Sequence, residues 1–184
     1  MLLLVDNVSS YFNDIVECLT KINAQHTIKK YKELDGHDIN NYDGIILSGR
    51  TNNIKSMNVA NMQLINSAYN DDKPLLGICY GAEITALAFN GLLQRLNDRI
   101  IGNNNIIVNK DNPLTSKKTL DVFESHGYYI SRLPEDFTGI ADSNTCKYEI
   151  IAHKTKQIFG TQFHPEVSKD GLEILSNFVQ LTRH

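Results

Sequence analysis

Residues 73–83 restrict the possible folds most, because they place a strand, a cysteine and a helix start in direct succession. The apolar run before Cys79 is typical of a buried parallel strand. Gly77 and Gly81 lie two residues on either side of the cysteine, which is the spacing of a nucleophile elbow. The sharp turn of an elbow needs glycine on both sides, and the following helix start stabilises an anionic sulfur. A free cysteine is also often a small buried residue, so this motif alone fits both interpretations.

Strands and helices alternate through the first half of the chain. Apolar runs predict strands at residues 2–5, 27–31, 42–47 and 74–78. Apolar residues at helical spacing predict helices between them, marked by Phe12, Ile15, Val16, Leu19 and Ile22 and then by Val59, Met62, Ile65 and Tyr69. The alternation favours an open, mostly parallel sheet with helices on both faces, in which ligands bind at the carboxyl ends of strands. We therefore expect residues 48–50 to lie beside Cys79.

The second half has a different pattern, with short strands at close spacing. We expect strands at residues 119–123, 137–141, 148–152 and 157–163, the last three as antiparallel additions to the parallel core. A closing helix is predicted over residues 171–181, with its apolar face formed by Leu172, Leu175, Phe178 and Val179. There is no repeat or linker, so residues 1–184 are expected to form one α/β domain of flavodoxin-like type.

Composition narrows the class of protein. The formal net charge of −3 argues against nucleic acid as a main partner. Three widely spaced cysteines make no disulfide framework, which favours a reducing, cytoplasmic setting. The start of the chain lacks the basic lead of a signal peptide, and no apolar run is long enough to span a membrane. The six histidines have no metal-ligand spacing, so no metal is expected.

A second chemical motif is His164-Pro165-Glu166. A residue before proline favours extended backbone, in which residues two apart face the same way. A thiol nucleophile needs a base, and a histidine base needs a carboxylate to orient it. Cys79, His164 and Glu166 supply these three roles, although a short His-Pro-Glu turn alone is a weak signal.

Together these motifs resemble a class I (triad) glutamine amidotransferase domain, over nearly the whole chain and in the same order. The resemblance lies in residues 74–81 around the cysteine, residues 162–166 around the histidine, residues 46–49 at the oxyanion loop and Ser125-His126 at the substrate site.

The resemblance implies that Cys79 attacks the side-chain amide of L-glutamine and that His164, held by Glu166, moves the proton. It further implies that backbone N–H groups of Tyr80 and of the turn at Gly49 and Arg50 stabilise the oxyanion. Ser125 and His126 would bind the amino-acid end of glutamine. No cofactor is implied.

Two positions depart from the family pattern. Arg50 replaces a glycine in the oxyanion loop, and Glu83 replaces a glutamine that contacts the substrate. A non-glycine residue at position 50 restricts the backbone conformations of the loop. A glutamate at position 83 lacks the amide hydrogen-bond donor of glutamine. Either change could slow glutamine hydrolysis or make it depend on a partner. We also consider that Arg50 and Glu83 pair with each other.

The segments at residues 133–137 and 153–160 resemble the stand-alone glutaminase subunit of archaeal GMP synthase. That resemblance implies a separate ATP pyrophosphatase subunit that receives ammonia and converts XMP to GMP. The start of the chain, with Asp6, Asn7, Ser10 and Asn13, instead resembles anthranilate and aminodeoxychorismate synthase subunits. A subunit of another synthetase, a non-catalytic regulatory paralogue and a γ-glutamyl hydrolase-like enzyme remain alternatives.

Overall fold

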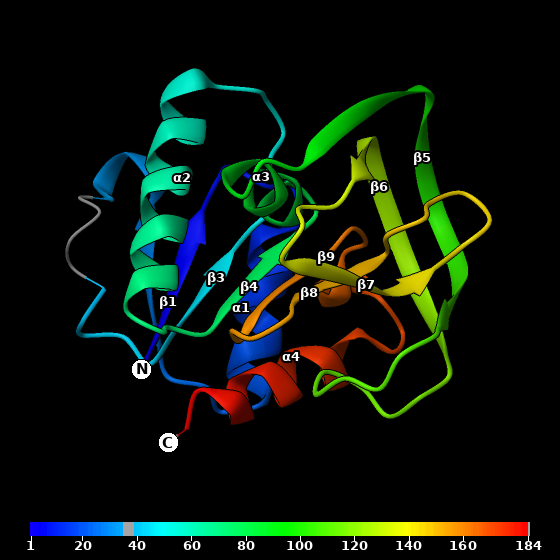
Figure 1. The fold of residues 1–184 in the computed structure, drawn as a ribbon. Helices are drawn as coiled ribbons and strands as arrows, with labels where there is room; N and C mark the ends of the chain where they lie inside the picture. The colour runs from blue at the N-terminus through cyan, green and yellow to red at the C-terminus, as the bar shows by residue number, and fades with distance from the viewer. Residues whose placement is uncertain (35–38, 184) are drawn as a thin grey trace.

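The computed structural model describes residues 1–34 and 39–183, and these form one nine-stranded sheet with helices packed on it (Figure 1). The strand order is β2-β1-β3-β4-β9-β8-β7-β5-β6. The strands are β1 (Leu2–Asp6), β2 (His26–Lys30), β3 (Gly44–Leu47), β4 (Leu75–Ile78), β5 (Leu92–Val108), β6 (Thr119–Arg132), β7 (Phe137–Asp142), β8 (Ile150–His153) and β9 (Ile158–Thr161). The α-helices are α1 (Phe12–Lys21), α2 (Lys55–Asn70), α3 (Tyr80–Ala88) and α4 (Gly171–Leu181), with 3₁₀ turns η1 (Tyr31–Glu33) and η2 (Pro165–Val167).

Helices cover both faces of the parallel part of the sheet. Side chains alternate along β1, so that Leu2 and Leu4 join a core with residues of α1 and α4. Leu3 and Val5 join the opposite core, with residues of α2 and α3. The predicted α/β class, with antiparallel strands added in the second half, is confirmed.

Strand β9 corrects the predicted topology. It pairs antiparallel with β8, as expected, but its other edge pairs parallel with β4. It is therefore the fifth parallel strand and completes the core, whereas the sequence suggested a peripheral addition. The short connection from β8 fixes only one neighbour of β9; the other neighbour lies far away in the sequence.

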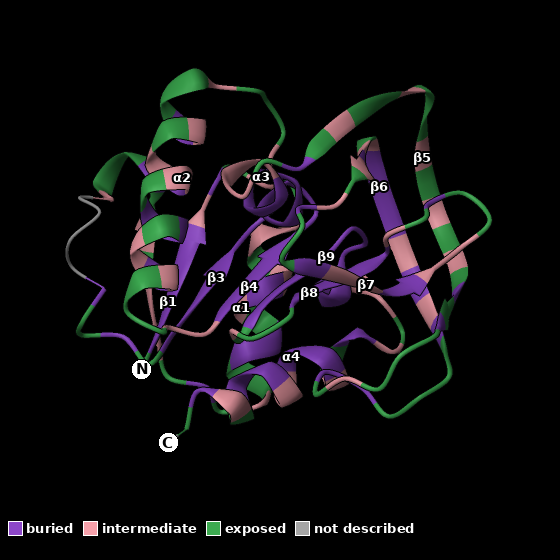
Figure 2. Ribbon diagram, viewed as in Figure 1, coloured by how far each residue is buried: buried purple, intermediate pink, exposed green. Residues whose placement is uncertain are grey.

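Strand β5 was not predicted from the sequence. It pairs antiparallel with β6 along most of its length, and together they form a ribbon that extends beyond the other strands (Figure 1). Figure 2 shows that β5 is mostly exposed or half-buried. Such a strand lacks the apolar alternation from which strands are predicted, so the sequence pattern does not reveal it.

The predicted apolar faces of two helices also need correction. Val59 of α2 is 47% exposed, and Leu172 of α4 is 39% exposed. Ile65 is buried as predicted, and the other buried residues of α2 are Met57, Asn61, Leu64 and Ala68. Asn61 is buried because it hydrogen-bonds Asn7. A polar residue on the buried face interrupts the apolar repeat, so the sequence does not show which side of the helix faces the core.

Helix α3 ends at Ala88, and Asn90 shortly after it has a left-handed backbone, with φ 67°. No helix among residues 1–34 and 39–183 is long and apolar enough to cross a membrane.

Candidate active site

Cys79 lies between β4 and α3 in a strained backbone conformation, with φ 52° and ψ −105°. Positive φ in a residue other than glycine costs on the order of 1–3 kcal/mol and persists only where the surroundings enforce it. Here they do, because a Cβ atom on Gly77 would lie 2.3 Å from the Gly81 carbonyl, and one on Gly81 would lie 2.4 Å from the Leu47 oxygen. The Cys79 N–H donates to the Thr161 carbonyl of β9 at 2.7 Å. The strand–turn–helix geometry of an elbow is thus present.

His164 and Glu166 converge behind this cysteine. The His164 Nδ1 lies 2.8 Å from Glu166 Oε1, and both side chains are buried. The backbone differs from the expected extended segment, because residues 165–167 form the 3₁₀ turn η2 and only His164 is extended. The turn brings the two side chains together through the proline, which occupies its first position.

The charge state of His164 depends on its two neighbours. Burial acts to lower the pKa of His164, but the negative charges of Cys79 and Glu166 and their hydrogen bonds outweigh it. The pKa of His164 therefore lies well above its usual value. Tyr11 covers the ring, with centroids 4.6 Å apart. The arrangement favours a histidine that holds a proton beside the sulfur.

The loop after β3 closes over the same residues. A Cβ atom on Gly49 would lie 3.1 Å from His164 Cε1 and 3.8 Å from Cys79 Cβ, so the loop backbone passes close to the Cys–His pair. A buried network of Asn7, Ser48 and Asn61 anchors this loop: the Asn7 N–H donates to Ser48 Oγ at 2.9 Å, and the Asn61 amide donates to Asn7 Oδ1 at 2.7 Å. Sequence reasoning missed the network because its members are separated by up to 54 positions.

Arg50 does not form the ion pair with Glu83 that the sequence suggested. Its guanidinium lies over the Tyr80 ring at 4.1 Å and donates to Asn53 at 2.7 Å and to Asn58 at 3.0 Å. The Tyr80 hydroxyl also donates to Asn58, at 2.9 Å. Arg50 thus ties the loop after β3 to the start of α3.

A pocket of about 170 Å³ opens beside the cysteine. Of the residues predicted for substrate contact, it brings together Arg50, Tyr80, Glu83, Ser125 and His126 with Cys79. His164 and Glu166 lie behind Cys79 and do not line it. Arg99 was not predicted; its guanidinium donates to Ser125 Oγ at 3.0 Å across the β5–β6 ribbon. The sequence offers no local signal for Arg99, because it lies in the stretch of β5 between Arg95 and Ile100 where the register with β6 shifts.

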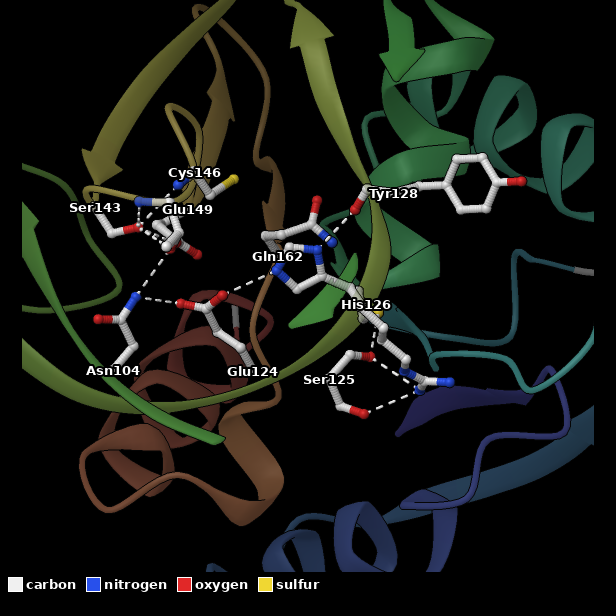
Figure 3. A network of polar contacts seen from close by, with 12 residues as sticks. Asn104, Glu124, Ser125, His126, Tyr128, Ser143, Cys146, Glu149 and Gln162 are labelled. Carbon is white, nitrogen blue, oxygen red and sulfur yellow. Dashed lines mark hydrogen bonds and ion pairs between the residues drawn. The ribbon is translucent and has the colours of Figure 1, made fainter. Parts of the chain in front are cut away.

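A buried polar network supports the wall of the pocket formed by Ser125 and His126 (Figure 3). The His126 Nε2 lies 2.9 Å from Glu124 Oε2, and its Nδ1 lies 2.8 Å from the Tyr128 carbonyl oxygen. Glu124 also accepts a hydrogen bond from the Asn104 amide. Burial raises the pKa of Glu124, but the hydrogen bonds from His126 and Asn104 outweigh it and the pKa is lowered.

Glu149 lies on the far side of this network and accepts a hydrogen bond from Ser143 Oγ at 2.7 Å. Burial, together with the charge of Glu124, raises the pKa of Glu149 to about 8. The surroundings therefore favour the ionised form of Glu124 and the protonated form of Glu149. His126 is held in place from both ring nitrogens.

Comparison with known proteins identifies the family. Residues 3–181 match the family described as glutamine amidotransferase class-I. A protein of Methanocaldococcus jannaschii, named as one of the subunits of GMP synthase (glutamine-hydrolyzing), is 33% identical over 98% of this chain and 97% of that protein. The GMP synthase of Vibrio atlanticus is 36% identical over 76% of this chain. The chain spans only about a quarter of that longer relative, since the match covers 27% of its length.

Solved structures of other proteins also match this chain. A Thermoplasma acidophilum protein, provisionally assigned as the corresponding GMP synthase subunit, superposes with a TM-score of 0.89 at 29% identity, covering 98% of this chain and 92% of that one. A glutamine amidotransferase from Thermotoga maritima gives a TM-score of 0.76 over 90% of this chain and 76% of that one, and its 23% identity supports the fold alone. The relatives include bacterial and archaeal proteins, so they do not assign an archaeal source. The chain belongs to the class I glutamine amidotransferase family.

Proposed function

We propose that residues 1–184 act as one glutaminase domain that hydrolyses L-glutamine to glutamate and ammonia at Cys79. The observation that carries the proposal is the strained Cys79 elbow beside His164, which Glu166 orients at 2.8 Å. Cys79 Sγ attacks the side-chain amide carbon, and the thiol proton passes through His164 to the leaving ammonia. Water then attacks the thioester, and His164 returns a proton to the sulfur as glutamate leaves.

The negative oxygen formed in each step needs hydrogen-bond donors. The N–H of Tyr80, at the start of α3, is one candidate, and an N–H of the Gly49–Arg50 turn is the other. Support comes from the close packing of Gly49 against Cys79 and His164 and from the contacts that fix Arg50 on Tyr80. Ser125 and His126 line the pocket where the amino-acid end of glutamine would bind.

The proposed partner is a separate synthetase subunit that consumes the ammonia. We favour the ATP pyrophosphatase subunit of a GMP synthase, which converts XMP to GMP. The support is the M. jannaschii relative, which is named as a single subunit of a GMP synthase and is matched over 97% of its length. A cytoplasmic setting remains part of the proposal.

Covalent labelling with a glutamine-mimicking diazoketone tests the glutaminase proposal without a partner. We expect one adduct on Cys79, located by peptide mass mapping, which excess glutamine prevents and Cys79→Ala abolishes. If Cys79 reacts with a small alkylating agent but not with the diazoketone, the pocket does not accept glutamine. Glutamine-dependent GMP formation with an added ATP pyrophosphatase subunit then tests the partner, and no GMP from glutamine would reject it.

A further inference from the structure

Glu83 is the buried acidic group that the proposed chemistry leaves unused. It lies one turn into α3, where its N–H donates to the Cys79 carbonyl at 3.0 Å, and its side chain lines the pocket. The residue is only 4% exposed. A buried carboxylate is costly unless cations or several donors surround it. The protonation state of Glu83 therefore depends on the groups that surround its carboxyl group.

The surroundings of Glu83 contain little to stabilise a negative charge. Among the described residues, no Lys, Arg or His nitrogen lies within ion-pair distance of its carboxyl group. The hydrogen bond to this carboxyl group comes from Gln162 Nε2, at 3.3 Å. The other end of that amide, Gln162 Oε1, is a buried acceptor without a hydrogen-bond partner in the described chain. The site thus has an excess of acceptors, and a proton on Glu83 would add a donor.

Each nearby cationic group already has another partner. Arg50 donates to two asparagines and lies over Tyr80. His126 faces Glu124, and His164 faces Glu166. Tyr80 and Cys146 also interact electrostatically with Glu83, and a charged Glu83 is unfavourable for the ionised form of either. Burial raises the pKa of Glu83, more than Gln162, Arg50 and the two histidines lower it.

The remaining charges in the pocket indicate the ligand. Arg50 and Arg99 line the same cavity as Glu83, and their hydrogen-bond partners Asn53, Asn58 and Ser125 are neutral. Their positive charges are therefore not balanced by these partners, so the pocket suits the carboxylate of an amino acid. An ionised Glu83 would repel that carboxylate, whereas a neutral carboxylic acid can donate a hydrogen bond to it. We propose that Glu83 acts in its neutral form as a hydrogen-bond donor to the α-carboxylate of bound glutamine. This proposal rests on the proposed glutaminase function.

Glutamine binding to a Cys79→Ser background, measured by calorimetry from pH 5.5 to 9.5, tests the proposal. We expect the dissociation constant to rise about tenfold per pH unit above the Glu83 transition, as one-proton linkage requires. Adding Glu83→Gln should remove this rise, because an amide does not titrate. Adding Glu149→Gln should retain it, and this control is needed because the pKa of Glu149 is also raised, to about 8.

The charge of Glu83 can also be read directly. In protein carrying ¹³C-labelled glutamate, the resonance missing from Glu83→Gln should have the shift of a protonated carboxyl group at pH 7. An ionised shift would overturn the proposal, as would glutamine affinity that increases with pH or a rise that persists in Glu83→Gln. If glutamine binds at no pH and the diazoketone does not label Cys79, the glutaminase proposal fails as well. Labelling with a flat affinity profile would reject only the role of Glu83.

Discussion

Gly81→Ala tests whether the elbow depends on close backbone packing. The new Cβ atom would lie 2.4 Å from the Leu47 carbonyl oxygen and 3.0 Å from Leu47 Cβ. Ordinary contacts are longer, so β3 or the first turn of α3 must move by about 0.6 Å or more. Because the blocking atom is backbone in the sheet, the strain cannot relax by rotating a side chain. Overpacking of this kind costs about 2–3 kcal/mol of unfolding free energy.

The same displacement should slow the chemistry. It would fall on the turn that aims Cys79 and the Tyr80 N–H, and a misplacement approaching 1 Å can cost on the order of 10²-fold in rate. We expect Gly81→Ala to lower the melting temperature by roughly 5–10 °C. Diazoketone labelling of Cys79 should slow by at least about tenfold in protein that is still folded.

Gly127→Ala is the matched control for stability. Its Cβ atom would meet nothing within 4 Å, so the same change should be neutral or stabilising by up to about 1 kcal/mol. Urea unfolding measures both variants, and labelling is compared at a temperature where each is folded. A Gly81→Ala protein as stable as wild type, with an unchanged labelling rate, would refute the packing argument.

Three further variants test the site. Glu166→Gln should lower the pKa of His164, followed by NMR, and reduce ammonia release by roughly 10²-fold; an unchanged pKa would mean that Glu166 does not set the charge of His164. Asn61→Ala leaves Asn7 Oδ1 buried without its donor and should cost about 1–3 kcal/mol in urea unfolding, a loss that the exposed Asn53→Ala should not show. Glu149 has a pKa raised to about 8 in the folded protein, so its contribution to stability is complete below its unfolded pKa and decreases as pH rises towards 8. Glu149→Gln should therefore flatten the decline in melting temperature from pH 5 to 8.5, and an equally steep decline would contradict the assignment.

Local motifs allowed much of the fold to be predicted. The elbow at Cys79 is encoded within a few residues, because a strand end, flanking glycines and a helix start must be adjacent. The alternation of apolar strands and helices likewise indicates a parallel sheet. By contrast, the pairing of β9 with β4 cannot be predicted from the residues near β9, since β4 lies far earlier in the chain.

Side-chain partners within the site were harder to predict. Arg50 was expected to meet Glu83, because both follow strands that end at the same edge of the sheet. Its guanidinium instead finds Tyr80 and Asn58, whose positions depend on the packing of α2 against α3. Arg99 lines the pocket from a part of β5 where the register with β6 shifts, and no apolar pattern in the sequence marks this part.

The central position of β9 has a consequence for how the chain folds. Leu75 of β4 pairs with Ile158 of β9, so the strand that carries the nucleophile gains its second neighbour only from a distant segment. Contacts of such large sequence separation slow folding. During synthesis from the amino terminus, Cys79 leaves the ribosome long before Thr161, whose carbonyl fixes its backbone, and before His164. The nascent chain therefore exposes an unassembled thiol, and glutamine hydrolysis can begin only once nearly the whole sheet has formed.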